Sequence, residues 1–255
     1  MVPARQPTTV STTHTNHPVY TTLLAKQFLT DPLFNYMFGT CSVPWYDRSP
    51  ATYHLIRLQL LAASYKSRAI FYSGASSPKP LAPSQAELNP QCCAVIMPPG
   101  EDTMALGLLG WASMLTHGVH KLVRLAGFSG WNTFVTEYVE PVARLKATVF
   151  RPDETYFYVF YIATDARHRG KGLAQAVIGE LQVRAQKEMR PVWLEASSPA
   201  SRRVYAKCGF EDVGEEMRLG VGEVDEFGDK VGKGGVGVPL FPMVWWPVGY
   251  LKKVV

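Results

Sequence analysis

A short run of basic residues and glycines in the second half of the sequence has the composition of a phosphate-binding loop. It lies between an apolar stretch at 156–163 and a stretch with helical spacing of apolar residues. The start of a helix exposes unpaired backbone N–H groups and a partial positive charge, and residues without side chains let a pyrophosphate approach them closely. The sequence therefore predicts an anion-binding loop at a strand-to-helix turn. Its members are Arg167, His168, Arg169, Gly170, Lys171, Gly172, Leu173 and Ala174.

The spacing of the glycines in this run excludes two other nucleotide-binding loops. Neither G-x-G-x-x-G nor G-x-x-x-x-G-K-[ST] occurs in it, and the pattern that remains is R-x-x-G-x-G at 167–172. A second group of residues follows the next expected strand, where Ser198-Pro199 has the cap and first-turn proline that open a helix. That helix carries Tyr205, Lys207, Gly209 and Phe210.

These two motifs together resemble the acetyl-CoA-binding half of the GNAT acetyltransferase superfamily, in which the second helix reads roughly N-x-x-A-x-x-x-Y-x-K-x-G-F. The resemblance implies an α/β fold with a central, mixed, twisted sheet flanked by helices on both faces. It also implies acetyl-CoA as co-substrate and no metal. By the same resemblance, the backbone of Tyr161, Ile162 and Ala163 pairs with the pantetheine arm. The run 167–174 then holds the pyrophosphate, and Ser198 belongs to the same cofactor site.

The resemblance further implies direct attack of an unprotonated amine on the thioester. Tyr205 matches the family's frequent general acid, which protonates the departing thiolate. Two carboxylates are candidates for the general base. Glu154 lies two residues before Tyr156, the position at which protein acetyltransferases of the superfamily carry glutamate, and Glu195 lies on the next expected strand. Deprotonation by solvent is the third possibility.

Two segments outside this region resemble the small-molecule branch that includes puromycin acetyltransferase-like proteins. They are DPLFNYMF at 31–38 and Pro-Pro-Gly at 98–100. We therefore expect an N-acetyltransferase that acts on a primary amine of a small molecule, such as an antibiotic-like compound, a xenobiotic or a metabolite. Two alternatives stay open: acetylation of a peptide or protein at a lysine or N-terminus, and a coenzyme A-binding module without transfer activity.

Apolar spacing predicts the elements that must position these residues. Because strand, helix, strand and helix alternate from residue 156 onward, the sequence predicts a parallel strand pair, with 156–163 as a central strand buried on both faces. The expected helices are two short ones within 20–38, one at 51–66, one from Leu173 to about residue 189 and one after Ser198; the expected strands are 69–73, 92–97, 156–163 and 191–196.

We expect a single GNAT acyltransferase domain at 19–255, preceded by a flexible leader at 1–18. Its coenzyme A-binding unit is expected at about 154–219, and a C-terminal hairpin at about 211–247 should enclose a Gly-rich loop at 220–237. A stretch rich in Ser, Pro and Ala at 74–90 is expected to be an exposed loop.

The charge distribution, the apolar stretches and the cysteines of the sequence limit the classes of binding partner that are expected. The formal charge of +5 is spread along the chain without a basic block, so a nucleic-acid partner is not expected. The longest apolar stretch, 104–115, is shorter than the roughly 20 residues that a bilayer span needs, so no membrane partner is expected either. Four cysteines without framework spacing favour a cytoplasmic protein with reduced thiols. The oligomeric state is left open.

Overall fold

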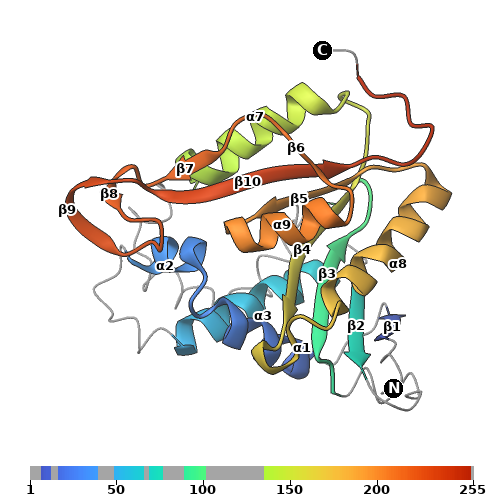
Figure 1. Cartoon of the computed structure of the whole chain (residues 1–255), viewed down its shortest axis with the longest axis horizontal. Helices are drawn as coiled ribbons and strands as arrows, with labels where there is room; N and C mark the ends of the chain where they lie inside the picture. The colour runs from blue at the N-terminus through green and yellow to red at the C-terminus, as the bar shows by residue number, and fades with distance from the viewer. Residues whose placement is uncertain are drawn as a thin grey trace.

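The chain is built around one mixed β-sheet, on which segments distant in the sequence lie side by side (Figure 1). The computed structural model describes residues 7–12, 17–39, 49–65, 69–76, 89–101 and 135–253. Within these residues eight strands form the sheet in the order β1-β2-β3-β4-β5-β10-β6, and β7 pairs with another part of β10. They are β1 (Pro7–Thr12), β2 (Ile70–Ser76), β3 (Cys92–Met97), β4 (Phe157–Thr164), β5 (Val192–Ala196), β6 (Glu211–Asp212), β7 (Met217–Leu219) and β10 (Val238–Trp245).

Helices cover both faces of this sheet (Figure 1). Helix α8 (Leu173–Glu188) packs on one face, and α1 (His17–Phe28) and α3 (Ser49–Tyr65) pack on the other. This arrangement confirms the expected α/β fold with a mixed sheet between helices. The remaining helices are α2 (Pro32–Gly39), the π-helical turn η2 (Val135–Val139), α7 (Glu140–Val149), the 3₁₀ turn η3 (Ala166–His168) and α9 (Pro199–Lys207).

Two apolar layers hold the sheet between the helices. On one face Val177, Ile178 and Leu181 of α8 are fully buried against β3 and β4. Leu24 of α1 and Leu60 of α3 are equally buried on the other face. Burial of a large aliphatic side chain stabilises the folded state by about 1.5–3 kcal/mol, so these layers fix the helices on the sheet.

The predicted strand-helix-strand-helix order is present, and β4 and β5 are parallel. Helix α8 ends at Met189, the only non-glycine residue of the described ranges with a left-handed backbone (φ 49°), and Pro191 follows soon after. A left-handed residue at the C-terminus and a nearby proline are typical helix stops. The local sequence signals therefore set the C-terminal boundary of this helix.

Strand β4 differs from the expectation of a strand buried on both faces. Its residues alternate between buried and half-buried up to Tyr161, and the last three are half-buried. The reason is that β5 diverges from β4 after Tyr158, so that the second half of β4 lines a cleft instead of a covered layer.

The expectation of a flexible leader at 1–18 is wrong for residues 7–12 and for the start of α1. Residues 7–12 form β1, which pairs antiparallel with β2 from Pro7↔Ser76 to Thr12↔Phe71. An uncovered strand edge presents unpaired backbone N–H and C=O groups, and a Thr- and Val-containing segment can satisfy them. Strand β2 also extends to Ser76, beyond the expected end at residue 73, because Gly74 still pairs with Cys92 of β3. The rest of the expected loop, 77–88, lies outside the described residues.

The C-terminal strands pair as a hairpin, but the segment between them is not an unstructured loop. Strand β10 pairs antiparallel with β7 at Val238↔Leu219 and with β6 at Met243↔Asp212. Residues 220–237, expected to be a loop, contain a second small sheet of β8 (Gly222–Val224) and β9 (Lys230–Gly235). Because this segment is rich in glycine, it lacks the alternating apolar residues by which a strand is recognised in a sequence. Backbone hydrogen bonds between β8 and β9 nevertheless order it.

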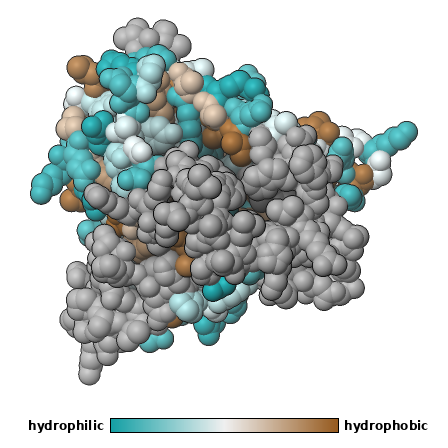
Figure 2. Space-filling view, turned by 180° about the vertical axis from the view of Figure 1, so that it is seen from behind, coloured by the Kyte–Doolittle hydropathy of each residue, from teal (hydrophilic) through white to brown (hydrophobic). Residues whose placement is uncertain are grey.

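The opposite side of the molecule presents mainly hydrophilic residues among its coloured atoms, with hydrophobic ones in small groups (Figure 2). The large apolar side chains that are most exposed in the described residues are Val183, Val221, Val248 and Leu251. None of the described helices combines the length and the apolar character that crossing a bilayer requires.

Candidate active site

The divergence of β4 and β5 opens a cleft that most of the expected site residues line. The two strands are paired at Phe157↔Val192 and Tyr158↔Trp193. Beyond Tyr158 the edge of β4 is left without β5 pairing, and the described residues around it enclose a cleft of about 1120 Å³. An uncovered strand edge can hydrogen-bond an extended ligand as an added strand would. Tyr161, Ile162 and Ala163, the expected partners of a pantetheine arm, line this cleft.

A β-bulge lies in the same stretch of β4. Val95 of β3 pairs with Tyr161 and Ile96 pairs with Val159, which leaves Phe160 as an extra residue. An extra residue reverses the side-chain alternation of a strand and turns its backbone. Accordingly, Val159 packs in the layer under α8, whereas Tyr161 packs in the layer under α1 and α3. In a regular strand Val159 and Tyr161 would face the same side of the sheet. The bulge at Phe160 instead places them on opposite faces.

The glycines of the expected phosphate loop have the backbone conformation that only glycine adopts readily. Gly170 and Gly172 have φ values of 74° and 73°, and Gly172 is the N-cap of α8. No side chain of the described residues caps this helix, and its first internal hydrogen bond runs from Ala176 N to Gly172 O. The preceding N–H groups at the helix start therefore remain available to an anion.

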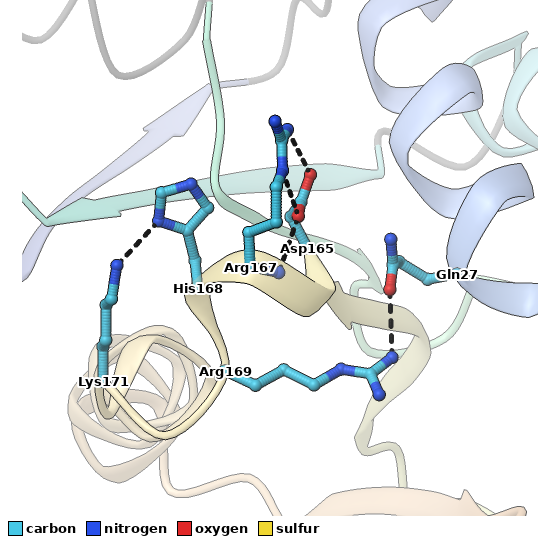
Figure 3. A network of polar contacts seen from close by, with 6 residues as sticks. All are labelled: Gln27, Asp165, Arg167, His168, Arg169 and Lys171. Atoms are coloured by element: carbon cyan, nitrogen blue, oxygen red, sulfur yellow. Dashed lines mark hydrogen bonds and ion pairs between the residues drawn. The ribbon is translucent and has the colours of Figure 1, made fainter.

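The basic side chains of this loop have different partners: Arg167 turns to Asp165, Arg169 reaches toward Gln27, and Lys171 and His168 approach each other (Figure 3). Arg169 and His168 line the cleft, and Arg169 Nη2 donates to Gln27 Oε1 of α1 at 2.9 Å. Arg167 instead forms a two-point pair with Asp165, at 3.1 Å and 2.9 Å. Its hydrogen bonds hold the pKa of that carboxyl well below its usual range.

Arg167 and Lys171 are outside the set of described residues that line the cleft. Lys171 Nζ lies 3.0 Å from His168 Nδ1. The remaining loop members, Gly170, Gly172, Leu173 and Ala174, do line it. One side of the loop therefore forms part of the cleft wall, whereas the charges of Arg167 and Lys171 lie outside the cleft lining.

Tyr205 lies on the cleft wall formed by α9. Ser198 starts this helix with a reciprocal cap, in which its Oγ accepts from Ser201 N at 3.2 Å and its own N–H donates to Ser201 Oγ at 3.2 Å. Ser198 lines the cleft too, but its side chain is engaged in the cap. The Tyr205 ring packs beside Phe210, and no hydrogen-bond partner of its hydroxyl is found in the described ranges. Burial raises the pKa of Tyr205 above its ordinary value, so the phenol keeps its proton at neutral pH.

The two carboxylates expected as candidate bases both line the cleft and both accept several hydrogen bonds. Glu154 accepts from the Tyr250 hydroxyl and from Arg151 N at 2.8 Å. Glu195 has a side chain that is only 4% exposed, and it accepts from the Trp193 indole and from Tyr158 at 2.7 Å. Donors from neighbouring elements therefore hold both carboxylates in place at the cleft wall.

Around Glu195 an aromatic box holds a lysine. Lys146 of α7 places its Nζ 3.4 Å from Glu195 Oε1 and 4.2 Å from the centre of the Tyr158 ring. The Tyr138 hydroxyl donates to Glu195 at 3.4 Å as well. Burial raises the pKa of both the Tyr138 and Tyr158 phenols, so they remain donors. The box ties α7 and η2 to the sheet at this end of the cleft.

A third carboxylate, Asp31, was not expected from the sequence. It is the first residue before α2, and its Oδ1 accepts from the backbone N–H groups of Leu33 at 3.0 Å and Phe34 at 3.4 Å. Its Oδ2 accepts from Ser197 Oγ at 2.5 Å, and Asp31 and Ser197 both line the cleft. Burial raises the pKa of Asp31 to about 6.

Asp31 also lies close enough to two phenols to affect them electrostatically. Its charge contributes to the raised pKa values of Tyr161 and Tyr205, after the larger effect of burial. In the sequence, Asp31-Pro32 has the form of an ordinary helix start, and no spacing connects it with residues 167–205. The described residues include no group of three or more His, Cys, Asp or Glu side chains able to hold a metal ion.

Comparison with known proteins agrees with this geometry. Residues 117–210 match the model of the Acetyltransferase (GNAT) family. A relative from Schizosaccharomyces pombe, an uncharacterized N-acetyltransferase, is 27% identical over 101 residues, which are 39% of this chain and 41% of the relative. The chain thus matches less than half of that protein's length.

Solved structures share the fold over nearly the whole chain at low sequence identity. An acetyltransferase of Corynebacterium glutamicum related to histone acetyltransferase HPA2 is 18% identical, with 94% of this chain and 96% of that chain covered and a TM-score of 0.55. Arylalkylamine N-acetyltransferase 2 of Aedes aegypti is 16% identical, with 93% and 98% covered and a TM-score of 0.53. The polyamine N-acetyltransferase of Drosophila melanogaster is 13% identical, with 94% and 100% covered and a TM-score of 0.50. The family match over residues 117–210 and the shared fold together support the assignment of this chain to the GNAT acetyltransferase family.

Proposed function

We propose that this protein transfers an acetyl group from acetyl-CoA to a primary amine of a small molecule. The observation that carries the proposal is the arrangement of one cleft. An uncapped helix start flanked by Gly170 and Gly172 lies at one side, and Asp31 and Tyr205 line the same cleft. This combination supplies a place for a pyrophosphate, a proton acceptor and a proton donor.

The cofactor side fits the shape and charge of acetyl-CoA. The open N–H groups at the start of α8 suit a pyrophosphate, and Arg169 and His168 add donors on the cleft side of the loop. The uncovered edge of β4 beyond Tyr158 suits an extended, amide-containing arm. When bound, acetyl-CoA supplies an activated acyl group.

The acceptor side fits an amine. With a pKa of about 6, Asp31 is largely ionised at neutral pH, attracts an ammonium group and takes the proton that the amine must lose. The amine lone pair then forms the new C–N bond, the C–S bond breaks, and the thiolate takes a proton from the Tyr205 hydroxyl. The nitrogen loses its second proton as the amide forms, and this proton restores the Tyr205 hydroxyl. Asp31 then passes its proton to solvent, so the step releases one proton overall and is balanced.

The proposal extends to the branch of the family, the domain organisation and the cellular location of the protein. The segment DPLFNYMF at 31–38 supports the small-molecule branch with puromycin acetyltransferase-like proteins, and the names of the Aedes and Drosophila neighbours, as amine acetyltransferases, are compatible with it. We also propose a single acyltransferase domain, which includes β1 and the whole of α1 and has its coenzyme A-binding unit at about 154–219. The free thiols of Cys92, Cys93 and Cys208 support a cytoplasmic location.

The test is release of free coenzyme A thiol from acetyl-CoA by the purified wild-type protein. We expect amine-dependent release with arylalkylamines or diamines and none with acetyl-CoA alone. Faster turnover of lysine peptides than of any small amine would favour the protein-acetylating alternative. Binding of acetyl-CoA without release across the whole panel would favour the non-catalytic module.

Arg169 should matter more for acetyl-CoA affinity than Arg167. Arg169 lines the cleft, whereas Arg167 is paired with Asp165 and its side chain is 76% exposed. A charge-assisted hydrogen bond to phosphate is strong, but exposure to solvent weakens it, so we expect Arg169→Ala to raise the Kd about 3- to 10-fold. Arg167→Ala should change it by less than about 2-fold. Calorimetric titration with acetyl-CoA measures the Kd of both variants. Equal Kd values would contradict the expectation that only Arg169 contacts the cofactor.

Tyr205→Phe should lower kcat by roughly 10-fold or more and leave acetyl-CoA affinity nearly unchanged. Phenylalanine keeps the packing against Phe210 and loses only the proton that the thiolate needs. Steady-state kinetics and calorimetry separate the two quantities. Tyr53→Phe is a control, because it makes the same change on an exposed tyrosine of α3 that does not line the cleft. Wild-type kcat in Tyr205→Phe would return Tyr205 to a packing role.

A further inference from the structure

The Gly-rich segment 220–237 lies against the helix that begins with the cleft carboxylate. Its β8-β9 hairpin projects at one end of β10, next to α2 (Figure 1). Asn35 Nδ2 of α2 donates to Phe227 O in the turn of this hairpin at 3.0 Å. The hairpin therefore contacts α2 within its first turn.

One glycine of the turn touches the backbone of α2. A methyl group on Gly228 would lie 2.4 Å from Pro32 O and 2.7 Å from Tyr36 N. Both separations are shorter than real carbon contacts allow, so any side chain at Gly228 must move the start of α2 or the hairpin. Pro32 is the residue that directly follows Asp31.

A carboxylate ties the same helix to the root of the hairpin. Glu137 Oε2 accepts from the Tyr36 hydroxyl at 2.7 Å and from Gly220 N at 2.8 Å. The Tyr36 ring is buried with Leu219, Val224 and Val238 of the surrounding strands. A methyl group on Gly220 would lie 2.5 Å from that ring. Contacts from four elements, η2, β7, β8 and β10, thus converge on one side of α2.

These contacts bear on Asp31 because Asp31 is bonded to α2. Its Oδ1 accepts from Leu33 N and Phe34 N, so the carboxylate moves with the first turn of the helix. Helix α2 has only eight residues, and a helix that short is unstable without tertiary contacts. The other tie of the carboxylate is the bond from Ser197 Oγ at the end of β5.

We propose that the β8-β9 hairpin braces α2 and thereby positions Asp31 in the acceptor half of the cleft, with Gly228, Tyr36 and Glu137 as positioning residues. This inference rests on the proposed function of Asp31. The hairpin acts through the backbone of α2 and touches neither the phosphate loop nor Tyr205. Damage to the brace should therefore affect the use of the amine and spare the binding of acetyl-CoA.

Three glycines of the hairpin allow a matched test. Gly228→Ala adds a methyl group at a left-handed position (φ 81°) that is in contact with α2. Gly234→Ala adds it at a left-handed position (φ 78°) with nothing within 4 Å, and Gly232→Ala adds it in open space without a left-handed backbone. Backbone strain is shared by the first two variants, whereas contact with α2 belongs to Gly228→Ala alone.

We expect Gly228→Ala to lower kcat/KM for the amine about 10-fold, with an unchanged Kd for acetyl-CoA. Displacement of α2 hydrates Asp31, and because burial is what raises its pKa, the acidic limb of the kcat/KM profile should move from about pH 6 to lower pH. The phenols of Tyr161 and Tyr205 face the same carboxylate, but they stay protonated throughout this range. Gly234→Ala and Gly232→Ala should keep the wild-type profile.

Equal kcat/KM and equal acidic limbs in folded Gly228→Ala and Gly234→Ala would overturn the brace. Should Gly228→Ala not fold, Tyr36→Phe removes one bond to Glu137 and keeps the ring, and it should lower kcat/KM about 2- to 3-fold with acetyl-CoA affinity intact. An unchanged kcat/KM in Tyr36→Phe would then overturn it. If Asp31→Asn leaves kcat/KM unchanged, the proposed role of Asp31 is wrong. If Asp31→Asn lowers kcat/KM but Gly228→Ala leaves it unchanged, only the proposed brace is wrong.

Discussion

Asp31→Asn should lower kcat/KM for the amine by about 100-fold or more, because general base catalysis typically contributes 10²–10⁴-fold. Asparagine has nearly the same shape and is as good a helix N-cap as aspartate, so the bonds to Leu33 N and Phe34 N can persist. The substitution thus removes the proton acceptor and the negative charge while preserving α2. Steady-state kinetics with a saturating acetyl-CoA concentration measure the loss.

The pH profile gives an independent readout of the same residue. A base must be deprotonated to act, so activity should fall as the pH decreases through about 6, the raised pKa of Asp31. With an ordinary aspartate pKa of 3.8, activity would persist to about pH 4. In Asp31→Asn this acidic limb should disappear, which leaves only the ionisation of the amine itself.

Asp153→Asn is the matched control, since it makes the same change of charge on an exposed residue outside the cleft lining. Its kinetics should equal those of the wild type. A folded Asp31→Asn protein with wild-type kcat/KM and an intact acidic limb would remove Asp31 from the mechanism. Glu154, Glu195 or solvent would then be the remaining candidates for the base.

Gly172→Trp should abolish the stabilisation of the protein by acetyl-CoA. Gly172 lines the cleft as the N-cap of α8, and an indole there would occupy the space in front of the open N–H groups. A ligand at 100 times its Kd stabilises the folded protein by about 2.7 kcal/mol, which is a rise in melting temperature of several degrees. Thermal denaturation with and without acetyl-CoA should show this rise in the wild type and none in the variant.

Gly172→Ala separates blockage of the site from backbone strain. Both substitutions place a side chain at φ 73°, but the methyl group of alanine meets only Gln175 Oε1, at 3.7 Å. We therefore expect Gly172→Ala to lower the melting temperature of the free protein and to keep most of the ligand-induced rise. A full rise in Gly172→Trp with native-like circular dichroism would show that acetyl-CoA binds elsewhere.

The elements that local sequence signals predict correctly lie in one continuous stretch, from β4 to α9. The apolar run of β4, the glycine turn, the apolar stripe of α8 and the Ser198-Pro199 cap are all signals that act between near neighbours. Such signals set helix and strand boundaries, and they were sufficient to predict the parallel β4-β5 pair and the glycine turn at the start of α8. The order of these motifs also carried the family resemblance.

Tertiary structure decided the residues whose roles depend on distant partners. Glu195 was a plausible base in the sequence, but the donors that satisfy it come from Lys146, Tyr158 and Trp193, on three different elements. Residues 7–12 gained a strand because β2 offered an open edge, which no local pattern announces. The glycines of 220–237 likewise became a hairpin through pairing between strands.

Asp31 shows the physical reason for this division. In the sequence it is a helix cap like many others. Its pKa rises to about 6 because folding buries it, and this effect exceeds the opposite effect of the hydrogen bond from Ser197. Burial and electrostatic coupling depend on distances between segments far apart in the chain, whereas capping and periodicity depend on neighbours. The sequence by itself therefore predicted a phosphate-binding loop, and only the tertiary structure showed which carboxylates line the cleft beside that loop.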